Sequence, residues 1–306
     1  MRIAITGSSG FIGRHLIKQL VSDKNELLLL DSNPVHDYVN VDGVQQISRD
    51  ICDPVLQDDL STFKPEVVIH LAAQKDVRFS IQYPEIDFRI NTEGSRNVFE
   101  SAFKSGSEHV IYASSGGAIY SESNPLPISE VSTILPKSPY GKHKYEAELA
   151  LYDLANKYGR TGTALRMSNA YGPGDKLGVA GIFVRKALAK ELITIVGDGT
   201  LTRDFIFVSD VVDAFILDIQ HRVNLPLNIS SATEISLNEL VKSIEKVSGF
   251  SIACEYRDSI NGEIQRSSLD NSLAKQQLNW EPQICMDQGI RELIDTLISE
   301  NSEAPQ

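Results

Sequence analysis

Residues 2–13, with the sequence Arg-Ile-Ala-Ile-Thr-Gly-Ser-Ser-Gly-Phe-Ile-Gly, decide the fold. The first five are mostly apolar and predict a short buried strand, and the glycines that follow predict a tight turn. Apolar side chains then recur at helical spacing, which predicts a helix over 11–22. The chain therefore opens as strand, glycine turn and helix.

The three glycines of this turn suit the binding of a dinucleotide. Gly7 makes the turn, Gly10 lets the backbone approach a pyrophosphate, and Gly13 lets the helix pack on the strand. The first helical residues, Phe11 and Ile12, follow at the end where free backbone N–H groups face the phosphates. We therefore expect these five residues to line a cofactor site.

An acidic residue at the end of the next strand indicates which dinucleotide is bound. The run of leucines in 27–31 predicts that strand, and it ends in Asp31. A carboxylate there accepts hydrogen bonds from the adenosine ribose hydroxyls and repels a 2′-phosphate. The sequence therefore favours NAD over NADP.

Two later segments are expected at the same site. Asp50 and Ile51 follow the predicted strand 45–48, which places Asp50 near the adenine. The predicted strand 66–71 runs into small residues on which a cofactor can lie flat. The expected contacts at its end are Leu71, Ala72, Ala73 and Gln74.

The composition excludes several classes of protein. The 306 residues are 42% hydrophobic and carry a formal charge of −12, with no basic run to attract a nucleic acid. No apolar stretch has the length of a membrane span, and the N-terminus lacks the pattern of a signal peptide. The three cysteines are scattered, without zinc spacing, so we expect reduced thiols, no metal and a cytoplasmic location.

The order of elements predicts the fold class. Strands are expected at 2–6, 27–31, 45–48, 66–71, 109–114 and 161–167, and helices at 11–22, 84–105 and 139–158. Such alternation is typical of a Rossmann-like, doubly wound parallel sheet in the α/β class. We expect a cofactor domain over 1–168, with 203–222 returning to it, and a smaller substrate-binding lobe over 169–306.

A tyrosine and a lysine on one helix face are the candidate catalytic pair. Tyr140 and Lys144 are four positions apart within the predicted helix 139–158, so their side chains share a face. A neighbouring ammonium favours the phenolate, which lowers the pKa of Tyr140 from about 10 toward neutrality. A phenolate can take a proton from a hydroxyl while a hydride leaves the same carbon.

Three further residues are expected near this pair. The predicted strand 109–114 delivers Ser114 and Ser115 to its carboxyl end, where a hydroxyl can hold a substrate oxygen and share a proton with Tyr140. Which of the two serines does so stays open. Asn91 lies on the predicted helix 84–105 and is expected to support the cofactor site.

With these residues assembled, the chain resembles an extended short-chain dehydrogenase/reductase, and within that group a nucleotide-sugar 4-epimerase of the UDP-glucose type. The resemblance runs from residue 6 to about 210, with weaker similarity to Trp280 and Pro282. The segments that carry it are 6–13, 70–74, 91–94, Tyr140 with Lys144, 166–174 and 197–205.

The resemblance implies further roles and an assembly. Asn169 would contact the diphosphate of a nucleotide sugar, Arg203 would pair with a phosphate, and Lys144 would also hold the nicotinamide ribose. Ser267 would line the hexose pocket, where a small side chain leaves room for an N-acetyl group. Relatives pair the helices 84–105 and 139–158 across a dimer interface, so a homodimer is expected.

The segment that follows the serine strand narrows the expected reaction. Dehydratases and decarboxylases that the chain resembles carry an acid there, whereas 114–120 holds none. The chemistry left is hydride removal and hydride return. We therefore expect an NAD-dependent epimerase of UDP-glucose and UDP-galactose, or of the N-acetylated pair, that oxidises C4, turns the 4-keto sugar over and reduces it again.

The sequence departs from the family pattern at two positions and leaves three competing functions open. Gly116 stands where some relatives place the catalytic hydroxyl, and Ile260 replaces an arginine whose role Arg257 would have to take. A UDP-uronate 4-epimerase would need a cation, from Lys176 or Arg185. A 4-keto-sugar reductase is disfavoured by Asp31, and a catalytically silent NAD-binding protein is disfavoured by the intact Ser, Tyr and Lys set.

Overall fold

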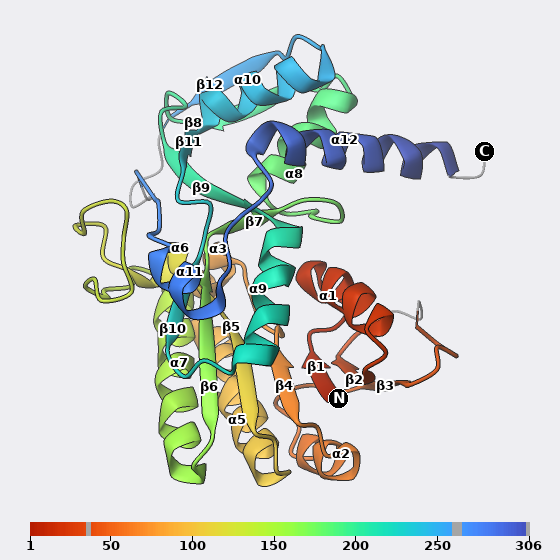
Figure 1. Ribbon diagram of the computed structural model, residues 1–306. Helices are drawn as coiled ribbons and strands as arrows, with labels where there is room; N and C mark the ends of the chain where they lie inside the picture. Colours follow the sequence, from red (N-terminus) through yellow and green to blue (C-terminus); the bar gives the residue numbers. More distant parts are fainter. Residues whose placement is uncertain (35–37, 259–264, 304–306) are drawn as a thin grey trace.

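The computed structural model describes residues 1–34, 38–258 and 265–303, and its main layer is a seven-stranded parallel sheet (Figure 1). The strand order is β10-β6-β5-β4-β1-β2-β3. The strands are β1 (Arg2–Thr6), β2 (Glu26–Asp31), β3 (Val44–Ser48), β4 (Val67–His70), β5 (His109–Ser115), β6 (Thr161–Met167) and β10 (Pro226–Ile229). The direction of winding reverses between β1 and β4, which places a ligand crevice beyond their carboxyl ends. The predicted fold class is confirmed.

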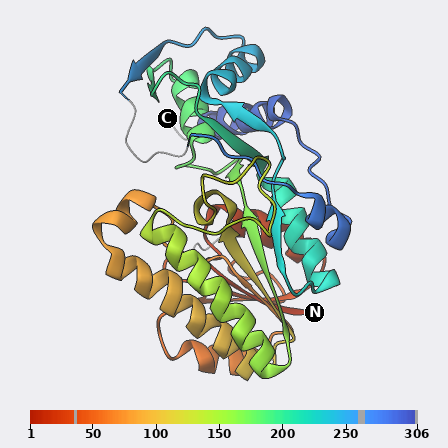
Figure 2. The same cartoon turned by 90° about the vertical axis from the view of Figure 1, so that its left-hand side faces the viewer.

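Helices cover both faces of this sheet, which explains why the central strands β1, β2, β4 and β5 are almost entirely buried. One face carries α1 (Phe11–Ser22), α9 (Val208–His221) and α11 (Ser272–Leu278). The other carries α2 (Leu56–Phe63), α5 (Ser95–Lys104) and α7 (Pro139–Tyr158). Figure 2 shows the green α7 and the turquoise α9 on opposite sides of the strands. Each face forms its own core, for example around Phe215 on one side and Phe99 on the other.

The helix that carries the candidate catalytic pair has clear start and stop signals. The Ser138 hydroxyl accepts a hydrogen bond from the Gly141 amide at 3.1 Å, and Pro139 occupies the first turn. Gly159 ends the helix with a left-handed φ of 63°. These signals are local, so the predicted bounds of 139–158 match α7.

The predicted helix 84–105 is not uniform. It consists of α4 (Pro84–Phe88), a π-helical turn η1 (Arg89–Gly94) and α5, and α3 (Val77–Gln82) precedes it. Asn91 lies in the wide turn, fully buried. A π turn of this kind often marks a functional site, because the extra residue redirects a side chain.

A smaller lobe lies beyond the carboxyl ends of the large sheet, at the top of Figure 1. A three-stranded sheet has the order β11-β9-β7, and β8 pairs with β12. The elements of the lobe are β7 (Asn169–Tyr171), α8 (Val179–Leu188), β8 (Ile193–Val196), β9 (Thr202–Phe207), β11 (Glu234–Ser236), α10 (Leu237–Ser248), β12 (Cys254–Arg257) and α12 (Met286–Glu303). One further short helix, α6 (Gly116–Ile119), follows β5 in the large domain.

The chain crosses between the two lobes more than once. After β9 it returns to the large domain, where α9 packs on α1 and β10 pairs with β6. The division of the chain near residue 168 stays a prediction. Of the helices in the described ranges, none is long and apolar enough to cross a membrane.

Candidate active site

The glycine turn packs so closely against neighbouring backbone that it leaves no space for side chains at Gly7 and Gly13. Gly7 has a φ of +70°, and a side-chain Cβ there would lie 2.5 Å from the Ala72 amide nitrogen. A Cβ at Gly13 would lie 2.6 Å from the Ser8 carbonyl oxygen. No side chain caps the first turn of α1, whose N-cap is Gly10. Backbone N–H groups there lack a side-chain cap, which suits an anion, and the role of the turn in binding the cofactor stays a prediction.

A cleft of about 570 Å³ opens beside this turn, at the switch point of the sheet. Almost every predicted cofactor residue lines it: Gly7, Gly10, Phe11, Ile12, Gly13, Asp31, Asp50, Ile51, Leu71, Ala72, Ala73, Gln74, Tyr140 and Lys144. Ser114 lines it as well. Sequence reasoning missed other lining residues, among them Ser32, Arg49, Lys75, Arg89 and Met167.

The predicted acids at the cofactor end are already oriented by backbone amides. Asp31 accepts from the amides of Ser9 at 3.0 Å and Asn33 at 2.9 Å. Asp50 accepts from the amide of Cys52 at 2.9 Å. Each carboxylate therefore holds a fixed direction at the edge of the cleft.

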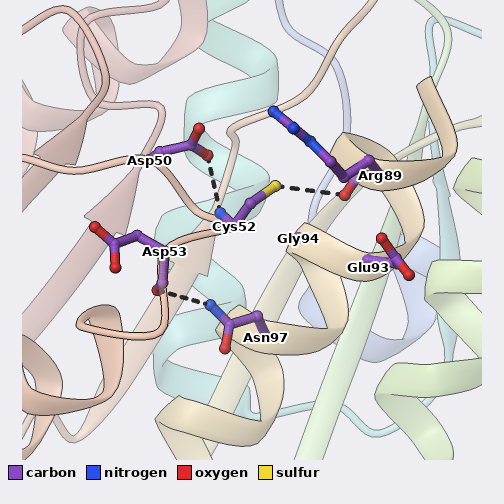
Figure 3. Close-up of a pocket in the computed structure, with 7 residues that line it drawn as sticks. All are labelled: Asp50, Cys52, Asp53, Arg89, Glu93, Gly94 and Asn97. Atoms are coloured by element: carbon purple, nitrogen blue, oxygen red, sulfur yellow. Dashed lines mark hydrogen bonds between the residues drawn. The ribbon is translucent and has the colours of Figure 1, made fainter. Parts of the chain in front are cut away.

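A second cavity, of about 470 Å³, adjoins the cleft at Asp50 and Arg89, which line both (Figure 3). Figure 3 shows Cys52 between these two residues, with its thiol directed to the Arg89 carbonyl oxygen at 3.4 Å. Burial, followed by the nearby Asp50 charge, raises the pKa of the Cys52 thiol to about 11. Cys52 is therefore an inert thiol at neutral pH.

Asn91 does not line the cleft; it holds a residue that does. Its side-chain oxygen accepts from the Gln74 amide at 3.1 Å, and its side-chain nitrogen donates to the Gln74 carbonyl at 2.8 Å. A side-chain amide thus pairs with both backbone groups of Gln74. Asn91 thus holds Gln74 in the wall of the cleft, and its predicted role toward the cofactor stays a prediction.

Tyr140 lies at the inner end of the cleft, beside Ser115. Its backbone amide donates to the Ser80 hydroxyl at 3.1 Å, which fixes the start of α7 against α3. Burial raises the pKa of the Tyr140 phenol to about 12, and a hydrogen bond with Ser115 opposes that rise. The lowered pKa expected from Lys144 is therefore wrong in direction, because burial outweighs the other effects.

The ammonium of Lys144 is used elsewhere in the structure. It donates to the Ala113 carbonyl at 2.7 Å and lies 4.2 Å from the centre of the Tyr112 ring. Burial lowers the pKa of Lys144 to about 7, against the opposing pull of two carboxylates, Glu148 and Asp87. Lys144 is thus a buried cation whose charge depends on its neighbours.

The two candidate serines have different partners. Ser114 donates to the buried carboxylate of Glu148, whereas Ser115 is close enough to the Tyr140 phenol to oppose the rise in its pKa. Gly116 has no room for the hydroxyl that some relatives carry, because a Cβ there would lie 2.3 Å from Leu269 Cδ1. Of the three positions, Ser115 is the one placed to act with the tyrosine.

A buried ion pair lies beneath this centre, and sequence reasoning missed it. Arg166 Nη2 is 2.7 Å from Glu148 Oε2, and both side chains are almost fully buried. Arg166 also donates to the Tyr120 hydroxyl at 2.8 Å. Glu148 could have been found from spacing alone, since it continues the four-residue row of Tyr140 and Lys144 along α7.

Of the predicted substrate residues, Ser114 lines the cleft, whereas Ser115, Asn169, Arg203 and Ser267 lie outside its lining. Asn169 is exposed on β7 and donates to the Asp204 carbonyl at 3.1 Å. Arg203 lies on strand β9, not on the preceding glycine-rich turn, and donates to the Thr202 carbonyl at 2.7 Å. Ser267 is buried, with 5% of its surface exposed. Their roles stay predictions.

Two of the candidate cations, Arg257 and Arg185, already have partners. Arg257 is exposed on β12 and pairs with Glu255 at 2.5 Å, and the predicted departure at Ile260 lies outside the described residues. Arg185 donates to the carbonyls of Asp175 and Lys176, at 2.6 and 2.7 Å. Within the described residues, no group of three or more acidic, histidine or cysteine side chains forms a metal site.

Comparison with known proteins identifies the class. Residues 3–230 match the model of the NAD dependent epimerase/dehydratase family. The chain belongs to this family, which confirms the resemblance noted in the sequence and the expected cofactor, NAD.

Individual relatives agree with the family. The chain is 36% identical to a putative UDP-glucose 4-epimerase of Methanocaldococcus jannaschii, over 98% of this chain and 99% of the relative. Among solved structures, it matches the UDP-glucose 4-epimerase of Thermotoga maritima with UDP-glucose, at a TM-score of 0.94 and 32% identity, covering 98% and 100% of the two chains.

A third relative has a different sugar in its name. The UDP-N-acetylglucosamine 4-epimerase of Methanobrevibacter ruminantium, in complex with UDP-N-acetylmuramic acid, matches at a TM-score of 0.91 and 29% identity, covering 98% of each chain. Relatives with nearly the same fold thus differ in the hexose that they are named for. The fold alone therefore leaves the sugar open.

Proposed function

We propose that this protein is an NAD-dependent nucleotide-sugar 4-epimerase, acting on UDP-glucose and UDP-galactose or on the N-acetylated pair. The observation that carries the proposal is that Tyr140 and Lys144, one turn apart on α7, both line the cofactor cleft, with the end of the serine strand beside them. The names of the relatives support the same reaction.

The proposed mechanism assigns one task to each residue. Tyr140 takes the proton of the sugar 4-hydroxyl, and Ser115 holds that oxygen by a hydrogen bond. NAD, when bound, supplies the acceptor for the C4 hydride and a positive ring that lowers the pKa of the nearby phenol. Lys144 would hold the nicotinamide ribose. The 4-keto sugar turns over about its diphosphate linkage, so that the hydride returns to the other face.

The surroundings of the catalytic pair favour epimerisation over dehydration or decarboxylation. Those reactions need a second acid or base that can reach the sugar, and 114–120 supplies none. The nearby carboxylate of Glu148 is buried and held by Arg166, so it is committed to an ion pair. With no further acid at this point, hydride removal and return are the reactions that the site supports.

The choice of hexose rests on the smaller lobe. Ser267 has a small side chain, and in the expected position it leaves room for an N-acetyl group. A uronate substrate would depend on Lys176, because Arg185, the other candidate cation, already donates to two backbone carbonyls. A reductase is also less favoured, because Asp31 at the end of β2 repels the 2′-phosphate of NADP.

A substrate panel tests the proposed function. The purified protein, with NAD bound, is incubated separately with UDP-glucose, UDP-N-acetylglucosamine and UDP-glucuronate, and the sugar protons are followed by NMR. We expect a 4-epimer from at least one of the first two. No conversion, together with no reduction of bound NAD by any of the three, would instead support a silent NAD-binding protein.

We also propose a homodimer through α3, α4 and α7. These three helices contact one another, and exposed apolar side chains gather on them. The largest exposures are at Ile81, 64%; Leu149, 47%; Ile86, 44%; Val77, 40%; and Phe88, 39%. A patch of this kind is typical of an interface between subunits.

Light scattering tests the assembly. The double variant Ile81→Asp with Ile86→Asp should be a monomer at concentrations where the parent is a dimer. Val131→Asp is the matched control, because Val131 is 95% exposed but lies away from these helices, in the loop before α7. A monomeric parent, or a dimer that survives the double change, would contradict the proposed interface.

A further inference from the structure

A buried aspartate next to the catalytic centre is not used by the mechanism above. Asp87 lies on α4 with no exposed surface, and three side chains donate to its carboxylate. The donors are His143 Nδ1 at 2.6 Å, Asn91 Nδ2 at 3.0 Å and Gln74 Nε2 at 2.5 Å. A fully desolvated charge with this many fixed partners has one stable position.

The partners of Asp87 connect it to the cofactor cleft. Asn91, held by Asp87, pairs with both backbone groups of Gln74, and Gln74 lines the cleft. The same carboxylate also holds the side chain of Gln74. Asp87 therefore fixes the segment after β4 in two ways, through the backbone and through the side chain.

The third partner connects Asp87 to the catalytic helix. His143 directly precedes Lys144 on α7, and its ring also meets Phe88 edge-on at 5.4 Å between centroids. The Asp87 charge disfavours the phenolate of Tyr140, and thereby raises its pKa, while it favours the ammonium of Lys144. A single carboxylate thus acts on both members of the catalytic pair.

The ionisable groups around this centre come from several elements. Tyr140, His143, Lys144 and Glu148 lie on α7, and they are faced by Tyr112 from β5 and by the buried His70 from β4. The remaining partners of Asp87, from η1 and from the segment after β4, are neutral amides. Glu148 is compensated by Arg166 from β6, so Asp87 and Glu148 are the two carboxylates that act on Lys144.

We propose that Asp87 is a positioning residue of the reaction, which holds the Gln74 segment against the cofactor and sets the ionisation of Tyr140 and Lys144. This inference rests on the proposed function, because it concerns the ionisation of Tyr140, the proposed catalytic base. Removing the charge stabilises the phenolate and destabilises the ammonium. The ionisations of Tyr140 and Lys144, and with them both limbs of the pH–rate profile, therefore move to lower pH.

The chain offers a matched control for this test. His109 Nε2 is 3.1 Å from Asp218 Oδ2, and neither side chain has exposed surface. This second Asp–His pair lies at the start of β5, six residues and roughly 20 Å from Ser115. In both pairs an asparagine can keep every hydrogen bond, with its oxygen accepting from the same donors and its nitrogen donating to an imidazole.

The experiment compares Asp87→Asn with Asp218→Asn. The NAD-saturated proteins are titrated, and the ionisation of Tyr140 is followed as the tyrosinate absorbance that disappears in a Tyr140→Phe background. Asp87→Asn should lower the midpoint by about one pH unit or more, because a nearby charge shifts a pKa by roughly that amount. It should also weaken NAD binding, whereas Asp218→Asn should change neither.

The outcomes separate this inference from the proposed function. The titration needs no turnover, so a shifted midpoint supports the role of Asp87 even if no sugar is converted. A folded Asp87→Asn protein with the parent midpoint, or with the same change as Asp218→Asn, would overturn the proposal. Asp87→Ser is a second variant, which removes the charge with a smaller side chain. If neither Asp87 variant folds, Asp87 is needed for the structure itself, and the proposed positioning role is also overturned.

Discussion

Removal of Glu148 should destabilise the protein strongly, because it leaves a buried guanidinium without its counterion. The Arg166 side chain is 4% exposed and that of Glu148 is 1% exposed, and Arg166 donates to both carboxylate oxygens. Breaking such a pair costs about 3–5 kcal/mol. The remaining hydrogen-bond partners of Arg166 are neutral: the Tyr120 hydroxyl and the Glu130 backbone carbonyl.

The expected loss of unfolding free energy corresponds to a decrease in melting temperature. An unfolding entropy of about 2.1 cal/mol/K per residue, taken over 306 residues, gives roughly 0.64 kcal/mol/K. Glu148→Ala should therefore lower the melting temperature by about 5–8 °C. Calorimetry of the NAD-free protein measures this change directly.

A double variant and an exposed control complete the test. Glu148→Leu combined with Arg166→Met removes both charges, so it should restore most of the lost stability. Lys246 and Asp287 form an exposed ion pair, in which the lysine side chain is 74% exposed, and Lys246→Ala should leave the melting temperature nearly unchanged. A drop of less than about 2 °C for Glu148→Ala would refute the reasoning.

Two further predictions concern the cofactor end. Gly7→Ala should lose NAD binding and stability, measured as the NAD content of the purified protein and by calorimetry. Gly106→Ala is the control, because it bears left-handed backbone strain but its Cβ would meet nothing within 4 Å, so it should keep NAD. An equal loss of NAD binding in both variants would exclude the clash with Ala72 as the cause. Asp31→Ser should weaken the binding of NAD about tenfold or more and reduce the preference of the protein for NAD over NADP. Calorimetric titration with each dinucleotide measures both effects. An unchanged preference would contradict the role of Asp31.

Six of the seven strands of the large sheet could be predicted because their signals are local, whereas β10, a short strand that reaches the sheet from later in the chain, was not. The strands are short apolar runs bounded by turns, and the glycine turn, the cap at Ser138 and the stop at Gly159 are set by neighbouring residues. The helix α2 was missed, because its eight residues give few turns of periodicity. The π turn around Asn91 was missed because it depends on a tertiary contact, the pairing with Gln74.

The candidate site was predicted in its residues better than in its electrostatics. Tyr140 and Lys144 share a helix face, as spacing requires, but burial decides their pKa values, and burial is a property of the assembled fold. Asp87 reaches the same centre from α4, a contact between segments far apart in sequence. Spacing along one helix cannot show such a neighbour.

The conversion of a UDP-hexose by Tyr140→Phe, compared with the parent, tests the central claim most directly. Tyr256→Phe, at an exposed tyrosine on β12, is the control and should keep the parent rate. With NAD bound in all three proteins, the account predicts a loss of about 10²–10⁴-fold for Tyr140→Phe, as expected when a general base is removed. Near-parental epimerisation by that variant would contradict the account.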